Sequence, residues 1–349
     1  MAMAKENTTL ATDKTKMRSR PLAATLILTV GVVLLGVSVM IAISFGAADI
    51  TFNDVWRAVF SFDASSHEQQ VIRELRLPRV LGALLVGASF AVAGAIMQGM
   101  TRNPLADSGL LGLNAGAVLA MAVCFAFFPN TSYGMLIVFS FLGAAVSVAL
   151  VFGIGSMAKG GLTPLRLVLA GAAVSALFGA LSEGIALYFR IGQDLAFWYA
   201  GGVSGTRWSH LTILVPVVVL AIGGAITISR SITLLSLGED IATGLGQKTK
   251  HIKLFGTLIV LVLAGSAVSV IGPVGFVGLI IPHLTRYIVG VDYRFIIPCS
   301  AVLGALLLIW ADLIARTINP PYETPIGALI ALIGVPFFLY LARKERRTL

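Results

Sequence analysis

Long apolar runs separated by short polar segments occupy most of this chain. A helix needs roughly 20 apolar residues to cross a bilayer, and ten runs come near that length. The runs that we predict to be spanning helices cover residues 22–45, 79–100, 107–128, 134–157, 166–189, 210–229, 254–272, 274–290, 295–315 and 325–342. The seventh and eighth are divided only at Gly272-Pro273. The pattern predicts an all-α polytopic membrane protein.

The distribution of basic residues orients these helices. With ten spans both termini lie on one side, whose segments hold 18 of the 25 Lys and Arg residues, against 7 on the other side. Cytoplasmic segments of membrane proteins are enriched in Lys and Arg. The sequence therefore predicts a multi-pass cell-membrane protein with both termini in the cytoplasm.

The domain organisation follows from the first apolar run. That run is 24 residues long, whereas the apolar core of a signal peptide spans about 7–15 residues. We therefore predict a polar cytoplasmic tail at 1–21 and a single transmembrane domain at 22–349, with its first helix retained.

Composition excludes several other classes. The chain is 57% hydrophobic and 12% charged, whereas a soluble domain carries about 25% charged residues. The net charge of +9 does not indicate nucleic-acid binding, because the basic residues lie in short groups between apolar runs. The sequence holds no Walker A loop, so ATP is not expected to bind this chain by that device.

Glycine and cysteine are both predicted to serve packing. Glycines inside the runs, such as Gly87 and Gly94, should let helices approach closely. Cys124 and Cys299 match no redox or metal spacing, and small core residues explain them better. His283 is a lone histidine and weak evidence for a ligand site. We expect no cofactor and no metal in this chain.

The cytoplasmic segment 230–253 is too short and polar to cross the membrane, yet it carries an apolar stripe. Leucine and isoleucine recur at three- and four-residue steps, and Gly238 and Gly244 should divide the segment into two short helices. An exposed apolar stripe indicates either a partner protein or a helix lying on the bilayer surface. The stripe consists of Leu234, Leu237, Ile241 and Leu245.

Three arginines lie at the outer ends of predicted spans. Arg76 and Arg79 share one helix face at the start of the second span, and Arg316 ends the ninth. Arginines at helix ends often extend to the membrane interface, but a planar guanidinium also suits docking of a carboxylate. Asp312, four residues before Arg316, could hold or neutralise that arginine.

Two further features lie along the spans. In the turn Asn103-Pro104-Leu105, the proline stops the helix and Asn103 can cap the next turn of the chain. Glu183 lies deep inside a span beside Ser182. Because an unpaired carboxylate in lipid is costly, Glu183 is predicted to line a translocation path or to make an interhelical hydrogen bond.

Several of these segments resemble one known family. Arg76–Arg79 (RLPR), Arg102–Ala106 (RNPLA), Gly272–Arg286 (GPVGFVGLIIPHLTR), and Ala311–Arg316 (ADLIAR) with Pro325-Ile-Gly327 are similar to FecCD/BtuC-type permeases. These are the membrane subunits of type II ABC importers for iron-siderophores, haem or vitamin B12. The resemblance implies two halves related as an inverted repeat, for which the sequence itself gives only a faint hint.

The resemblance also implies roles for residues. The segment 230–253 would dock into an ATPase subunit, and Arg76, Arg79 and Arg316 would pair with glutamates of a substrate-binding protein. The cytoplasmic gate would combine Asn103 and Leu105 with the loop before the fifth span, here Thr163 and Pro164. The coupling residues would be Leu234, Leu237, Gly238, Glu239, Ile241 and Leu245.

The expected function is transport of iron(III)-siderophore into the cytoplasm, with no enzymatic activity in this chain. The implied partners are a second permease copy or a close homologue, two ATPase subunits that bind ATP and Mg²⁺, and the binding protein. Haem or cobalamin is the alternative cargo. An ion-coupled secondary transporter is the rival class, but it would need several charges within the spans.

Overall fold

The computed structural model describes residues 19–45, 51–157, 163–200, 202–319 and 322–345. These residues form helices joined by short connections, and no strand occurs among them, which confirms the all-α prediction. The longer helices are α1 (Pro21–Ser44), α4 (Leu77–Thr101), α5 (Leu113–Phe127), α6 (Tyr133–Met157), α7 (Pro164–Phe189), α9 (Trp208–Leu237), α11 (Thr249–Ile271), α12 (Val277–Val289), α13 (Tyr293–Thr317) and α14 (Ile326–Glu345). The short ones are α2 (Phe52–Phe60), α3 (His67–Val71), the π-helical turn η1 (Ile72–Arg76), the 3₁₀ turn η2 (Ser108–Leu111), α8 (Gly192–Ala200) and α10 (Glu239–Gly244).

Each predicted span overlaps one of the longer helices. Seven of these helices are long and apolar enough to cross a membrane, whereas α5, α12 and α14 are shorter apolar helices. The structure thus confirms where the apolar helices lie, although it does not establish that ten of them cross the membrane.

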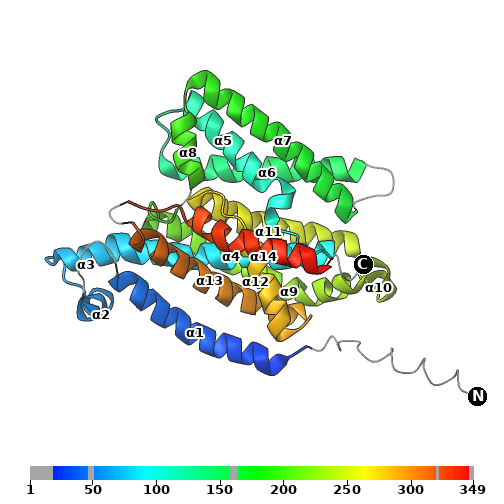
Figure 1. The fold of residues 1–349 in the computed structure, drawn as a ribbon, viewed down its shortest axis with the longest axis horizontal. Helices are drawn as coiled ribbons and strands as arrows, with labels where there is room; N and C mark the ends of the chain where they lie inside the picture. The colour runs from blue at the N-terminus through cyan, green and yellow to red at the C-terminus, as the bar shows by residue number, and fades with distance from the viewer. Residues whose placement is uncertain (1–18, 46–50, 158–162, 201, 320–321, 346–349) are drawn as a thin grey trace, which may run out of the picture.

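Helix α4 lies at the centre of the molecule. It packs against α13, α11, α9 and α12, and its most apolar stretch is 83% buried. Helices α5, α6, α7 and α8 form a separate group on one side of α4 and α11, while α1 packs along α13 on the opposite side (Figure 1). Helices α2 and α3 lie at one end of the molecule, here called the α2–α3 end, and α10 lies at the other, the α10 end (Figure 1).

Glycine makes the close packing around α4 possible, as predicted. A Cβ atom on Gly87 would collide with the backbone of Gly304 in α13, and one on Gly94 would collide with the backbone of Gly278 in α12. Only glycine lets these helices approach so closely at these points. We infer that α4 is held by backbone-to-backbone contact, which small residues permit in membranes.

Two predicted boundaries are wrong. The sixth span was expected to end at residue 229, but α9 continues to Leu237, so the predicted pair of short cytoplasmic helices is one extension of α9 followed by α10. The hydroxyls of Ser229 and Thr233 donate to carbonyls within the helix, so the polar residues do not interrupt it. The third span was expected from residue 107, but Gly112 (φ 69°) separates η2 from α5.

The division between the seventh and eighth spans is confirmed. Helix α11 ends at Ile271, Gly272 follows with φ 78°, and α12 begins at Val277. A φ angle in this range is readily adopted by glycine. The chain therefore turns at the predicted Gly272-Pro273 step.

Candidate functional site

The α10 end carries the predicted apolar stripe. Gly238 has φ 142° and separates α9 from α10, a conformation that disfavours other residues. The side chains of Leu237, Ile241 and Leu245 are 48%, 51% and 61% exposed, whereas Leu234 is partly buried against the core. Three of the four predicted residues thus form an exposed patch, here called the α10 patch.

An ion pair ties α10 to α11. The carboxylate of Glu239 accepts hydrogen bonds of 2.7 and 2.8 Å from the Lys253 ammonium. Partial burial opposes ionisation of Glu239, but the bonds from Lys253 and Thr249 and the charge of Arg102 outweigh it, so the pKa of Glu239 is lowered. The position of α10 is therefore fixed relative to the start of a spanning helix.

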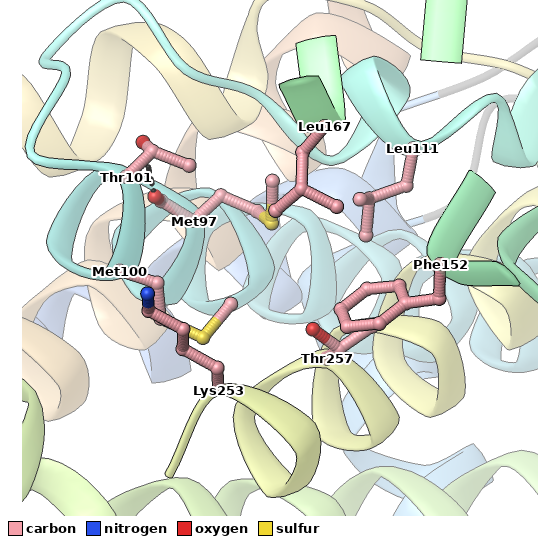
Figure 2. Close-up of a pocket in the computed structure, with 8 residues that line it drawn as sticks. All are labelled: Met97, Met100, Thr101, Leu111, Phe152, Leu167, Lys253 and Thr257. Carbon is pink, nitrogen blue, oxygen red and sulfur yellow. Dashed lines mark hydrogen bonds between the residues drawn. The ribbon is translucent and has the colours of Figure 1, made fainter. Parts of the chain in front are cut away.

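Lys253 also lines a small cavity where η2, α6 and α7 meet α4 and α11 (Figure 2). The cavity has a volume of about 20 Å³, enough for about one water molecule. It is otherwise lined by Met97, Met100 and Thr101 of α4, Leu111 of η2, Phe152 of α6, Leu167 of α7 and Thr257 of α11. Lys253 thus contacts α10 and also the place where α6 and α7 meet α4 and α11.

The Glu239–Lys253 pair predicts a pH-dependent contribution to stability. Since the pKa of folded Glu239 lies below its ordinary value of 4.5, the pair stabilises the fold above that pH and loses its contribution as pH falls through the folded pKa. Glu239→Gln should lower the thermal unfolding temperature near neutral pH. The corresponding loss in the free energy of unfolding should be no more than about 1 kcal/mol. The difference from wild type should vanish in acid.

The matched control for this experiment is Asp240→Asn, which removes an exposed carboxylate from the same helix. It should leave the unfolding temperature nearly unchanged at every pH. A Glu239→Gln variant as stable as wild type at neutral pH would contradict a stabilising role for the pair.

The first half of the predicted gate forms a capped turn after α4. The side-chain oxygen of Asn103 accepts a hydrogen bond of 2.9 Å from the Leu105 amide, as the capping prediction required. Leu105 is partly buried against apolar side chains of α12 and α14, including Leu279 and Leu341. The turn therefore contacts the helices of the C-terminal half.

The second half of the predicted gate lies at the start of α7. The Thr163 hydroxyl accepts a hydrogen bond from the Arg166 amide, and Pro164 is the first residue of the helix. Residues 160–162 of this loop lie outside the described residues. The gating role of both halves stays a prediction.

The two predicted path residues on α7 face different ways. Ser182 is buried, and its hydroxyl donates to the Phe178 carbonyl at 2.6 Å. Glu183 is exposed, in the last two turns of the helix. Burial and, second, the charge of Glu183 raise the pKa of Tyr199 on α8, so this carboxylate lies near that side chain. Glu183 is thus the one of the pair that could meet water, cargo or another chain.

At the α2–α3 end, two of the predicted docking arginines bind backbone carbonyls. Arg76 is 7% exposed and donates to the Ile43 and Ser44 carbonyls at 2.8 and 2.9 Å. Arg316 donates to the Ala42 carbonyl at 2.5 Å. Both guanidinium groups therefore hold the end of α1 against α4 and α13.

Arg79 forms the centre of an ion-pair network. Its guanidinium binds both oxygens of Asp312, with the shortest distance 2.8 Å, and also binds Glu323 at 2.5 Å. Asp312 was predicted to hold or neutralise Arg316, and the two side chains do form an ion pair, at 3.7 Å. The principal partner of Asp312 is Arg79, which is remote in sequence.

Sequence reasoning missed one member of the Arg79 ion-pair network and two short helices. Glu323 precedes α14 in a polar connection and carries no pattern that links it to Arg79. Helices α2 and α8 are too short to have been recognised among the apolar runs.

The cysteines behave as predicted: both are buried and free. Among the residues that the structure describes, no group of three or more His, Cys, Asp or Glu side chains could hold a metal ion.

Together these features define a polytopic helical membrane protein whose two ends carry different chemistry, an apolar patch at one and a largely buried arginine network at the other. The chain belongs to the FecCD transport family, whose model matches residues 34–344. The resemblance that the sequence motifs indicated is thereby confirmed, and the chain is a transporter permease embedded in the membrane.

Individual relatives match nearly the whole chain. It is 51% identical over 344 residues to the iron(3+)-hydroxamate import system permease protein FhuB of Bacillus subtilis (strain 168), covering 99% of this chain and 90% of the relative. It is 38% identical over 315 residues to the ferric enterobactin transport system permease protein FepD of Escherichia coli (strain K12), covering 90% and 94%. A solved structure of a metal-chelate type ABC transporter in an inward-facing conformation has TM-score 0.81 and 31% identity, covering 92% of this chain and 99% of that one.

Proposed function

We propose that this chain is the permease subunit of an ABC importer that moves iron(III)-siderophore into the cytoplasm. The observation that carries the proposal is the 51% identity to an iron(3+)-hydroxamate permease over 99% of the chain. Haem and cobalamin are the alternative cargoes of the same architecture. The rival class, an ion-coupled secondary transporter, would require several charges along the path, and Glu183 alone is thin support for it.

The proposed assembly has a second permease, the same chain or a close homologue, and two ATPase subunits that supply the ATP and Mg²⁺ chemistry. The ATPase subunits would bind at the α10 end, where the exposed Leu237, Ile241 and Leu245 offer an apolar contact. A binding protein would dock at the α2–α3 end. Both chain termini would lie in the cytoplasm, in keeping with the excess of basic residues on that side.

The proposed docking of a binding protein involves Arg76, Arg79 and Arg316. Arg79 and Arg316 form ion pairs with Asp312 and Glu323, and Arg76 donates to backbone carbonyls at the end of α1. Glutamates of an acidic partner would be attracted to these guanidinium groups, which favours encounter at low salt. In the same assembly, Asn103, Leu105, Thr163 and Pro164 would form the cytoplasmic gate.

The test of this function is transport by the reconstituted complex. The permease, its ATPase subunits and the binding protein would be placed in liposomes with ATP. Uptake of ferric hydroxamate, haem and cobalamin would then be compared with and without ATP. ATP-dependent uptake of the ferric hydroxamate supports the proposal; uptake of only haem or cobalamin, or uptake that depends on an ion gradient without ATP, contradicts it.

The role of Glu183 is tested by two substitutions with opposite consequences. If Glu183 lines the path, Glu183→Gln should change the uptake rate while the complex still assembles. If it is an interhelical strut, Glu183→Leu should lower thermal stability and yield, and the glutamine variant should be nearly silent. Uptake and unfolding temperature are the two measurements. If neither variant changes the uptake rate or the unfolding temperature, both roles are contradicted.

A further inference from the structure

Two adjoining cavities lie at the α2–α3 end, apart from the arginine network. The first, of about 320 Å³, runs between α6, α9 and α11, and is lined chiefly by Ile137, Val138, Ile213, Leu214 and Val217. The second, of about 310 Å³, lies at the ends of α6 and α9 and has several polar side chains in its lining. It is lined by Tyr133, Gly205 and Arg207, and it shares Gly134, Ser209 and His210 with the first. Together they form an amphipathic groove, here called the α6–α9 groove.

The depth of the α6–α9 groove matches one leaflet of a bilayer. Along α9 its lining extends from Ser209 to Val217, which is eight residue steps or about 12 Å at 1.5 Å per step. Half of the hydrocarbon core of a bilayer is roughly 15 Å thick. The groove also opens on helices that are mostly exposed, since only 28% of the most apolar stretches of α6 and α9 is buried. Its apolar part therefore has the length and exposure that a fatty-acyl chain requires.

Amphipathic aromatic side chains place the polar part at headgroup depth. Tyr133 donates its hydroxyl to the Val270 carbonyl at 3.0 Å, and Trp208 donates its indole N–H to the Arg73 carbonyl at 2.8 Å. Tyrosine and tryptophan with a polar end and an apolar body are enriched at the membrane interface. The polar cavity beside them therefore lies where a lipid phosphate would lie.

The polar part also offers a positive charge. Arg207 is exposed, and within the described part of the chain no carboxylate approaches its guanidinium to ion-pair distance. Arginine binds phosphate with its planar fork of donors, and the Ser209 hydroxyl on the same wall can donate to a second oxygen. A zwitterionic headgroup carries a cationic group that would lie close to the positive charge of Arg207, whereas an anionic headgroup carries none.

We propose that the α6–α9 groove binds an anionic phospholipid, with one acyl chain against Val138 and Ile213 and the phosphate at Arg207 and Ser209. This site is separate from the α10 patch and from the arginine network, and it does not depend on the cargo of the permease. Bound lipid would fill the space between α6 and α9 and fix the polar connection that precedes α9.

The experiment compares phosphatidylglycerol with phosphatidylcholine on the purified full-length permease. Native mass spectrometry, in detergent with equal parts of the two lipids, counts the lipid molecules that each variant retains. Arg207→Gln should reduce the preference for phosphatidylglycerol about fivefold, the effect of one basic side chain at a headgroup. Gly134→Leu should reduce retention of both lipids, because a Cβ on Gly134 enters open space within the shared part of the groove.

Arg190→Gln is the matched control, because Arg190 is also exposed at the α2–α3 end but lines neither cavity. It should leave the lipid preference unchanged, and Val138→Phe provides a second variant that fills the groove. The proposal is overturned if the wild type shows no preference, or if Arg190→Gln lowers it as much as Arg207→Gln. It is also overturned if the assembled permease dimer excludes the lipid that a single chain retains, since a second chain would then cover the groove.

Discussion

Replacing Arg79 with alanine should destabilise the protein by about 3–5 kcal/mol, the usual cost of leaving a buried charge without its partner. The side chain of Asp312 is only 1% exposed, and Arg79 binds both of its oxygens. Arg316, at 3.7 Å, is too far to replace these hydrogen bonds. Thermal and denaturant unfolding of the purified protein in detergent measure the loss.

Two further variants make this prediction specific. Arg79→Ala combined with Asp312→Ala should lose less stability than Arg79→Ala alone, because no uncompensated carboxylate remains. Arg73→Ala is the control: Arg73 is exposed six residues earlier and lies over the Phe62 ring at 4.4 Å, so its loss should cost at most about 1 kcal/mol. Equal losses for Arg79→Ala and Arg73→Ala would contradict a structural role for the network.

The Arg79 network also determines how the proposed docking of a binding protein can be examined. Substitutions of Arg76, Arg79 or Arg316 would disturb buried contacts, so a loss of binding would be ambiguous. Glu323 is 47% exposed and binds the same guanidinium that an incoming glutamate would need. A Glu323→Gln variant leaves the Arg79–Asp312 pair intact while it removes the competing carboxylate.

Most of the fold could be predicted from the sequence, because long apolar runs are a strong signal in a membrane protein. The boundaries that failed depended on local chemistry. Hydroxyl side chains such as that of Thr233 donate hydrogen bonds to carbonyls within α9, so a polar stretch remained helical. Gly112 turns the chain after η2, so an apolar stretch did not remain one helix. Hydropathy reports neither effect.

The sites were predicted less completely, since their partners are remote in sequence. The apolar stripe was recognised from its periodicity, but the burial of Leu234 depends on its packing against the core. The three arginines were recognised as a group, but the pairing of Arg79 with Asp312 joins residues 233 positions apart. A single sequence specifies which charges exist and leaves open which of them neutralise one another.

Replacing Leu237 with glutamate should weaken binding of the ATPase subunit by about 2 kcal/mol or more, roughly 30-fold, because apolar anchors at the centre of an interface carry most of its free energy. Leu237, Ile241 and Leu245 are exposed together at the α10 end. A carboxylate among them would be desolvated without a partner on docking. Binding of the ATPase subunit to the permease in nanodiscs, and its co-purification, measure the effect.

The controls for Leu237→Glu separate the loss of an apolar contact from the gain of a charge. Leu237→Met keeps an apolar side chain of similar volume and should bind nearly as wild type. Thr243→Glu adds the same charge to exposed α10 outside the α10 patch and should have a smaller effect. If α10 instead lies on the bilayer surface, the ATPase subunit should bind Leu237→Glu as tightly as wild type. That outcome would assign the α10 patch to lipid rather than to a protein partner.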